Sequence, residues 1–438
     1  MKQCSPSQAT HFFLALYNSD GTLRWAKQTE SFFAKLSLTP SGGLYAAGVF
    51  TRPFDIVLST GVTTRMTSRG DTDVFLIEYD ANGNAISVQQ IGGSRYDYVS
   101  SITVCNDDSL YIGGTFEGLL RLGQDRAASL QAPTDPNTIL TSIYLAKYTY
   151  QGLNLDIDWA TQIDRRSGSL AGVACGENNI PIIAGHFAQL ITFDPNGSPQ
   201  IWTAFGNNPD VYIAAYDKVN GDVLWVKQHG GIDTDLVFDI SIAPDNSIII
   251  SGLFSGNTIF GDGETSRTLL TSFGEFDNFA AKFDSAGNFL WVKQSGSQEN
   301  EPSDAHIDSF NDGRLMMAGI YGGTGLYASL AFGVSPRMHG VDSNNSNLFV
   351  AAYNPNGSFV DASHARGYGN SVMKGITALS DGSTVAVGNY NKMVSFPTIA
   401  NERGEVIQTN AAQGIFLSKY SSQLGFQWAK NLISAQGD

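Results

Sequence analysis

Residues 278–294, NFAAKFDSAGNFLWVKQ, contain the pattern from which the rest of the chain is built. Phe279, Ala281 and Phe283 alternate with Ala280 and Lys282, which is the period of a β-strand with two different faces. The next four residues, DSAG, have the composition of a hairpin turn, because the glycine can take a positive φ. The apolar run at 289–292 predicts the return strand, so the stretch predicts an antiparallel hairpin.

Seven copies of this hairpin follow one another at a spacing of about 67 residues. Each begins with an aromatic residue and has a second aromatic residue four positions later. The first aromatics are Phe13, Phe75, Tyr144, Tyr212, Phe279, Phe349 and Phe416. The repeat units begin near residues 12, 74, 143, 211, 278, 348 and 415. A unit that recurs so regularly is expected to bury its apolar face against its neighbours.

A second hairpin lies between successive copies of the first and ends in the pattern Gly-x-aromatic. It is clearest at residues 240–254, ISIAPDNSIIISGLF. Two hairpins per unit give four antiparallel strands, and radial repetition of such sheets makes a β-propeller. We predict an all-β chain with a single β-propeller domain spanning 1–438, with about seven four-stranded blades or, alternatively, six.

The two kinds of hairpin are unequal in number, with seven of the first kind and six of the second. One blade is therefore expected to lack two strands. Three explanations stay open: the chain is part of a larger protein, six blades close and the odd hairpin is appended, or another polypeptide supplies the strands by β-augmentation.

Composition excludes several functional classes. The net charge of −15 argues against a nucleic-acid partner, because phosphate binding needs a basic surface. No run approaches the roughly 20 apolar residues of a membrane span. The first ten residues, MKQCSPSQAT, lack the apolar core of a secretory signal, so the chain is either not exported by that route or is given without its leader. Of the two, we expect a particle component, which needs no signal.

The three cysteines are not expected to form a disulfide. Cys105 and Cys175 occupy nearly the same place in neighbouring units, where equivalent positions are expected to lie a blade apart and beyond disulfide reach. Both are predicted to be small buried apolar residues.

The repeat resembles the bacterial β-propeller repeat known as the SBBP repeat. The resemblance rests on residues 73–83 (DVFLIEYDANG), the glycine pair in 90–93 (QIGG), Asp97 and the ending in 110–116 (LYIGGTF). It covers essentially the whole chain and implies the propeller fold. It implies secreted or surface-associated proteins without shared catalytic residues.

Five of the seven units place Trp in the return strand, and we expect these side chains to pack between blades together with Phe279 and Phe283. The tryptophans are Trp25, Trp159, Trp225, Trp291 and Trp428. Trp225 and Trp291 in particular are predicted to be largely buried. The other two units have Ser87 and Asp361 at this position and are expected to pack more loosely. Residues 215–225 also resemble the tryptophan-docking motif of quinoprotein propellers, which joins one blade to the next.

Catalytic and metal motifs are scarce. None of the six histidines forms an HExxH pair, and the sequence has no GxSxG elbow. The Asp- and Asn-rich turns lack the alternating acidic run of a calcium loop, so turn chemistry explains them better; residues 262–264 are the best remaining calcium candidate. We expect no metal, no cofactor and no catalytic residue.

Long connections at 52–71, 123–140, 256–276 and 322–347 are the expected carriers of recognition. Among them, Tyr321 and Tyr327 flank a glycine-rich segment that suits protein or glycan contact. The main prediction is a non-enzymatic binding or assembly module, an adhesion or structural component of a cell surface or a virus particle. A propeller enzyme, either a hydrolase or lyase or a quinoprotein-like dehydrogenase, is the alternative.

Overall fold

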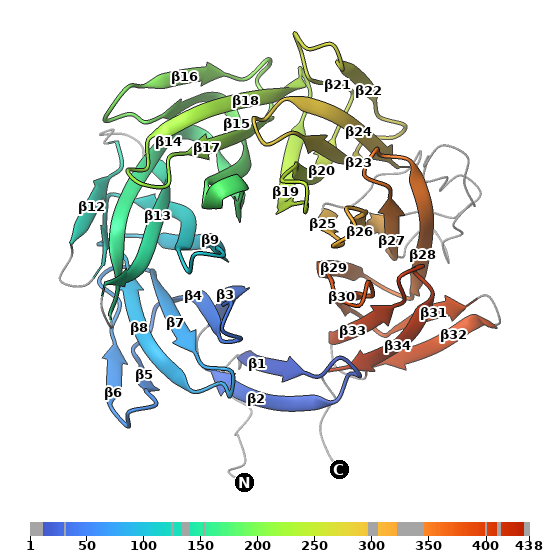
Figure 1. Cartoon of the computed structure of the whole chain (residues 1–438), viewed down its shortest axis with the longest axis horizontal. Coiled ribbons are helices and arrows are strands. Elements are labelled where there is room, and N and C mark those ends of the chain that lie inside the picture. Colours follow the sequence, from blue (N-terminus) through green and yellow to red (C-terminus); the bar gives the residue numbers. More distant parts are fainter. Residues whose placement is uncertain are drawn as a thin grey trace. The chain divides into compact units, whose positions relative to one another are not determined.

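The computed structural model describes residues 12–29, 32–123, 127–133, 140–151, 154–296, 305–321, 346–398, 401–409 and 413–432. The chain is all-β and folds as a β-propeller, from antiparallel blades that follow one another along the sequence (Figure 1). Two compact units can be distinguished. Unit 1 comprises 1–175, 191–201 and 216–223, and unit 2 comprises 176–190, 202–215 and 224–438.

Unit 1 contains two four-stranded blades and a two-stranded sheet formed by the first repeat hairpin, besides two further short two-stranded sheets described below. The first blade has the order β3 (Phe32–Leu38), β4 (Leu44–Phe50), β7 (Asp73–Tyr79), β8 (Ala85–Ile91). The next consists of β9 (Asp97–Val104), β10 (Leu110–Glu117), β13 (Thr141–Gln151) and β14 (Asn154–Cys175). The two-stranded sheet pairs β1 (Phe12–Tyr17) with β2 (Leu23–Thr29).

Unit 2 repeats the same blade. One blade consists of β19 (Asp235–Ile242), β20 (Ile248–Phe254), β23 (Asp277–Phe283) and β24 (Phe289–Ser295). The next consists of β25 (Ala305–Ser309), β26 (Leu315–Tyr321), β27 (Asn347–Tyr353) and β28 (Phe359–Gly367). The last consists of β29 (Ser371–Ala378), β30 (Thr384–Tyr390), β33 (Gly414–Tyr420) and β34 (Phe426–Asn431). In addition, β15 (Pro181–Phe193) pairs with β17 (Asp210–Tyr216), and a short 3₁₀ helix, η2 (Glu177–Asn179), precedes β15.

The long connections form short extra strands between the second and third strands of a blade, which we call the insert hairpins. They are β5 (Phe54–Val57) with β6 (Thr63–Met66), β11 (Leu119–Leu122) with β12 (Ala128–Gln131), β16 (Gln200–Thr203) beside β15, β21 (Asn257–Phe260) with β22 (Thr268–Thr271), and β31 (Met393–Thr398) with β32 (Asn401–Gln408). In unit 2, β21 pairs with the end of β18 (Val223–Gly231) and β31 pairs with the end of β28. An insert hairpin thereby extends the outer strand of the preceding repeat. Most of the expected loop at 322–347 lies outside the described residues.

One pairing explains why each blade carries the sequence Gly-x-aromatic. In six third strands the first repeat aromatic is fully buried and faces a glycine of the second strand. The pairs are Phe75 with Gly48, Tyr144 with Gly114, Tyr212 with Gly185, Phe279 with Gly252, Phe349 with Gly319 and Phe416 with Gly388. A Cβ atom on Gly252 would lie only 2.8 Å from the Phe279 ring, so a larger residue would displace the aromatic side chain.

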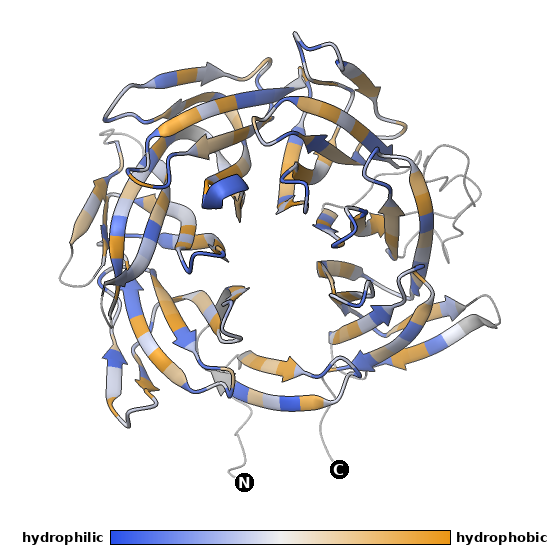
Figure 2. Ribbon diagram, in the orientation of Figure 1, coloured by the Kyte–Doolittle hydropathy of each residue, from blue (hydrophilic) through white to orange (hydrophobic). Residues whose placement is uncertain are grey.

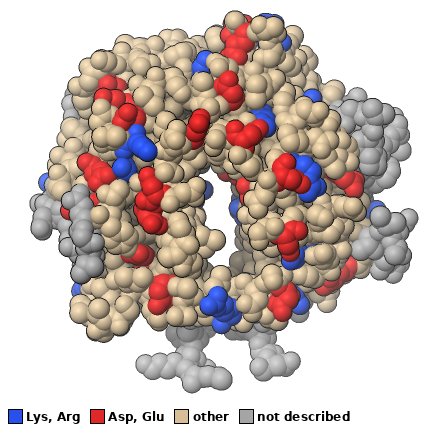
Figure 3. All heavy atoms as spheres, in the orientation of Figure 1, with Lys and Arg blue, Asp and Glu red and all other residues tan. Residues whose placement is uncertain are grey.

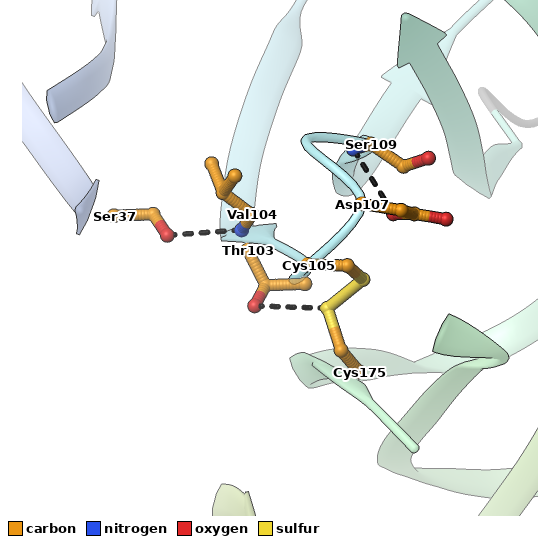
Figure 4. Close-up of a disulfide and its surroundings, with 7 residues drawn as sticks. All are labelled: Ser37, Thr103, Val104, Cys105, Asp107, Ser109 and Cys175. Carbon is orange, nitrogen blue, oxygen red and sulfur yellow. Dashed lines mark hydrogen bonds between the residues drawn. A yellow bond between two sulfur atoms is a disulfide. The ribbon is translucent and has the colours of Figure 1, made fainter. Parts of the chain in front are cut away.

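Cys105 and Cys175 form a disulfide, contrary to the sequence expectation (Figure 4). Their Cα atoms are 5.6 Å apart although 70 residues separate them in the sequence. The expectation was wrong because it treated all equivalent positions as a full blade apart. Cys105 follows β9 and Cys175 ends β14, and these two inner strands contact each other, so equivalent positions on them come close. Cys4 lies outside the described residues.

Candidate interaction surface

The repeat tryptophans join each sequence repeat to the hairpin turn of the following repeat. The rings of Trp25, Trp159, Trp225 and Trp291 lie against Gly83, Gly221, Gly287 and Gly357, respectively, which belong to those turns. Two indole N–H groups also donate to turn carbonyls: Trp159 Nε1 lies 3.1 Å from the Lys218 oxygen, and Trp291 Nε1 lies 3.1 Å from the Pro355 oxygen. Indole contact with a glycine leaves no gap for a side chain, so the turn and the ring fix the spacing of neighbouring repeats.

Burial of these tryptophans is less complete than the sequence predicted. Trp159 is 8% exposed, whereas Trp225 and Trp291 are only half-buried, as are Trp25 and Trp428. The return strand is the outermost strand of its blade, so one side of the ring faces solvent while the other covers the glycine. Phe279 and Phe283 are fully buried.

The repeat with Ser87 in place of Trp contacts the following repeat through other side chains. Tyr150 lies in an extended part of the β13–β14 hairpin and donates its hydroxyl to Glu78, which also accepts from Ser87 at 3.0 Å. The Tyr45 hydroxyl lies 3.2 Å from that of Tyr150. This repeat is therefore not left loosely attached to the next one. The contact was not predicted from the sequence, although Tyr144 and Trp159 lie 15 positions apart, three more than Phe279 and Trp291, which was a visible signal.

Acidic and histidine side chains meet on the inner strands of unit 2, which is where an enzyme would be expected to place them. Asp308 Oδ1 accepts from Ser241 Oγ at 3.0 Å, and its Oδ2 accepts from Thr377 Oγ1 at 3.1 Å and from the Ala378 backbone N–H at 3.0 Å. His306 Nδ1 lies 3.5 Å from Asp239 Oδ2. These contacts link β19, β25 and β29.

The arrangement connects strands and leaves little for catalysis. Asp308 also accepts from the Ser309 backbone N–H, so four donors occupy its two oxygens. Both ring nitrogens of His306 face protein oxygens, since Nε2 lies 3.3 Å from the Met373 carbonyl. A general base needs a free acceptor directed at substrate, and a fully occupied carboxylate does not provide one.

A second set of carboxylates is fully buried at the strand starts beside the glycine pairs. Asp210 accepts from the Phe205 backbone N–H at 2.7 Å and from Gln228 Nε2 at 2.6 Å. Asp235 accepts from the Gly231 backbone N–H at 2.8 Å and from the Thr258 hydroxyl of the insert hairpin. Asp73 and Asp97 repeat this arrangement in unit 1, with Gly93 donating to Asp97 at 2.7 Å. The carboxylates hold the insert hairpins in place.

Burial shifts the pKa values of these groups upward. It raises the pKa of Asp97 to about 8 and that of Asp235 to about 8, with the charges of Asp73 and Asp210, respectively, adding to the effect. Burial also raises the pKa of Asp210 to about 6. Oδ1 of Asp97 and Oδ1 of Asp210 have no hydrogen-bond partner among the described residues.

His229 is a further buried titratable group with a packing role. Its ring stacks on Phe260 and Phe283, and its Nδ1 accepts from the Gly261 backbone N–H at 3.3 Å. Burial lowers the pKa of His229 to about 3, so the ring is neutral at neutral pH.

No group of three or more His, Cys, Asp or Glu side chains is placed to hold a metal ion within the part of the chain that the structure describes. The carboxylates of the calcium candidate are already engaged: Asp262 pairs with Arg267 at 2.9 Å, and Glu264 accepts from the Phe289 backbone N–H at 2.7 Å. Asp80 and Asp284 accept from backbone N–H groups of their own turns, which is turn chemistry.

The insert hairpins expose aliphatic side chains. In β16 and β22 exposure alternates along the strand, with one face packed and one face open, and bands of hydrophobic residues are visible on these hairpins in Figure 2. The exposed side chains include Val57 (64%), Val62 (56%) and Ile201 (67%) in unit 1 and Leu269 (55%) and Val406 (48%) in unit 2. Acidic and basic side chains are scattered over the face drawn in Figure 3, without a continuous basic area.

Of the two tyrosines predicted for a recognition loop, Tyr321 lies in β26 and is 1% exposed, so its ring is part of the core and is closed to a ligand. Its place at the end of a Gly-x-aromatic strand explains this, since that position is buried in every described blade. Tyr327 lies outside the described residues. None of the helices among the described residues is long and apolar enough to cross a membrane.

Comparison with known proteins corrects the family expectation. No family model matches the chain, which overturns its assignment to the SBBP repeat family. The chain is instead 23% identical over 390 residues to an uncharacterized WD repeat-containing protein of Acanthamoeba polyphaga mimivirus. The alignment covers 75% of this chain and 27% of the viral protein, so the chain spans about a quarter of the length of the relative it matches.

Proposed function

We propose that this chain is a non-enzymatic protein-interaction module, a β-propeller scaffold that presents its insert hairpins to a protein partner. The observation that carries the proposal is that insert hairpins of each unit expose aliphatic side chains, and that buried carboxylates hold three of these hairpins in place. Val57, Ile201, Leu269 and Val406 are each at least 48% exposed. Beside the hairpins of the first three, the buried carboxylates of Asp73, Asp210 and Asp277 accept hydrogen bonds from backbone N–H groups. Apolar side chains on a rigid support suit a protein interface.

Two further observations support the proposal. The Asp and His side chains that could have indicated an enzyme are occupied by contacts between strands. The similarity to a WD repeat-containing protein is also in keeping with a propeller that serves as an interaction scaffold. We further propose, on the viral source of that relative and the acidic surface, that the module belongs to a virus particle or a cell surface.

A glycan is a second candidate ligand, favoured by one exposed aromatic pair. Tyr96 and Tyr98 are 44% and 45% exposed, and their rings lie nearly parallel, with centroids 6.4 Å apart and an interplanar angle of 5°. Parallel exposed rings next to Arg95 offer a surface on which a sugar ring could stack.

Site-specific photocrosslinking tests the protein-interaction proposal. A photoreactive phenylalanine is placed at Leu269 or Val406 on the insert hairpins, and at Val219 as a control, because Val219 is 76% exposed but lies in a blade turn. We expect a discrete crosslinked protein from the hairpin positions and none from Val219, with Leu269→Asp reducing the yield from the Val406 position about tenfold. Equal crosslinking from all three positions, or none from the hairpins in the native source, would overturn the proposal.

A further inference from the structure

One repeat strand has an open edge. The third strands of the other blades pair on both sides, as β7 does with β4 and β8. Among the described residues β1 pairs only with β2. Phe13 of β1 is 40% exposed, whereas the six residues at the same repeat position, from Phe75 to Phe416, are 0% exposed.

The exposure of Phe13 is not caused by a detached hairpin. Phe13 faces Gln28 of β2 in the same register in which Phe75 faces Gln90 and Phe279 faces Gln294. On its other face the hairpin is docked within unit 1, because Leu14 is 5% exposed in a cluster with Phe75, and Trp25 covers Gly83. The sheet is therefore a correctly placed outer half of a blade, and the open side is the one where a second strand would pair.

The six complete pairings define what would fit this edge. In each of them the second strand runs antiparallel, places a glycine opposite the aromatic residue and carries another aromatic two residues later. Gly252 and Phe254 are one example: a Cβ atom on Gly252 would lie 2.8 Å from the Phe279 ring, and Phe254 is fully buried. The missing strand is thus specified by the chemistry Gly-x-aromatic, preceded by a run of apolar residues.

We propose that β1 is an acceptor edge for a β-hairpin from outside residues 1–438, whose pairing strand places glycine opposite Phe13. The inference rests on the proposed protein-interaction function and names the kind of segment that the partner supplies. The donor is not a second copy in the same fold, because each Gly-x-aromatic strand that the structure describes already pairs with its own third strand. Pairing satisfies the free backbone groups of β1, and the donor's side chains cover Phe13.

A peptide with the sequence of residues 235–254, DLVFDISIAPDNSIIISGLF, serves as the probe, since it contains one complete inner hairpin. Binding of the fluorescently labelled peptide to the full chain is measured by anisotropy, and protection of residues 13–17 is measured by hydrogen exchange. We expect β1 amides to exchange faster than those of β7 in the free chain and to become protected when the peptide binds. The Gly252→Val peptide should bind at least tenfold more weakly, whereas a Ser247→Ala peptide, changed in the turn, should bind equally well.

Protein variants give the matched control. Phe13→Ala should weaken peptide binding several-fold, whereas Leu23→Ala, at an exposed position of β2, should not. The proposal is overturned if β1 is as well protected as β7 without peptide, if a homodimer protects it, or if the Gly252→Val peptide binds as tightly as the unchanged peptide. Crosslinking at the insert hairpins is a separate readout, so its failure alone would reject that surface and leave the β1 edge standing.

Discussion

Within each unit, neighbouring inner strands are joined through equivalent backbone N–H groups, but different side chains accept from them in the two units. In unit 1 the hydroxyl of Ser37 accepts from the Val104 N–H at 3.0 Å, and the hydroxyl of Ser101 accepts from the Val173 N–H at 3.0 Å. In unit 2 the carboxylates of Asp308 and Asp239 accept from the equivalent N–H groups, at 3.0 Å from Ala378 and 3.1 Å from Ile307. A carboxylate thus occupies the place of a hydroxyl, which shows that the Asp residues of unit 2 serve to hold strands together.

The units then differ in what reinforces these contacts. Unit 1 adds the disulfide between Cys105 and Cys175 (Figure 4). Unit 2 adds the hydrogen bonds of Asp308 to Ser241 and Thr377, together with the pairing of His306 with Asp239. Covalent and polar reinforcement of the same geometry should respond to different perturbations.

Reduction of the disulfide should have the largest effect on stability. A bridge that closes a segment of 70 residues stabilises the native state by about 4 kcal/mol, chiefly by restricting the unfolded chain. Thermal unfolding should therefore occur at a lower temperature with dithiothreitol than without it. The double variant Cys105→Ser, Cys175→Ser should melt at the lower temperature under both conditions. A wild-type melting curve that reductant does not change would contradict this account.

The tryptophan contacts test whether the two units are equally tightly packed. Trp159 in unit 1 is buried and Trp291 in unit 2 is half-buried, while both donate to a turn carbonyl. Trp159→Ala should cost about 3 kcal/mol and Trp291→Ala about half as much, because less apolar surface is lost. Urea unfolding of the two variants measures the difference. Equal costs would mean that the shared hydrogen bond, rather than burial, dominates the contact, and Trp→Phe variants at both positions would show this directly.

Asp308 tests the polar reinforcement of unit 2. Asp308→Ala removes the acceptor of four hydrogen bonds and should cost about 2 kcal/mol. Asp308→Ser introduces the hydroxyl that unit 1 uses and should recover part of that loss. If the Ser variant is no more stable than the Ala variant, a hydroxyl does not replace the carboxylate, and the equivalence of the two units fails.

Periodicity predicted the fold well because each copy of the repeat must solve the same burial problem. The alternation at 278–294 and the Gly-x-aromatic endings predicted the strands, and the excess of one hairpin predicted a two-stranded sheet, which β1 and β2 form. Contacts between repeats were harder to predict. The disulfide, the Tyr150–Glu78 contact and the Asp308 bridge each join residues about 70 positions apart, and a strand period does not indicate which inner-strand positions come close.

The SBBP resemblance failed for a related reason. The pattern Asp, aromatic, Gly-Gly, Asp follows from the packing of carboxylates around a glycine pair, as at Asp210, Gly230 and Asp235. A Cβ atom on Gly230 would lie 2.5 Å from Asp210 Oδ1 and 2.9 Å from Asp235 Oδ2. Such a physical constraint can produce the same pattern in different propellers, so it indicates the fold more strongly than the family.

Buried carboxylates should give an effect that appears only as a dependence on pH, and the two units share it. Asp97 in unit 1 and Asp235 in unit 2 both have a pKa raised by burial to about 8, above the ordinary value near 3.9 of an unfolded chain. The folded state therefore holds a proton that the unfolded state releases, so the stability contributed by each group is complete below about pH 4 and declines as the pH rises through about 8.

Asp97→Asn and Asp235→Asn remove this titration. Relative to wild type at the same pH, each variant should gain stability as the pH rises from 5 to about 8, by up to about 1.4 kcal/mol per pH unit, measured by thermal unfolding. Asp361→Asn, which removes a carboxyl at an exposed position, is the matched control for the substitution itself. Comparison at matched pH also removes the opposite contribution of His229, whose lowered pKa of about 3 makes stability decline as the pH falls below about 6.5. A difference between variant and wild type that stays constant from pH 5 to pH 9 would show that these carboxyls are ionised in the folded protein, and a trend at only one of the two positions would show that the glycine-pair sites of the two units are not equivalent.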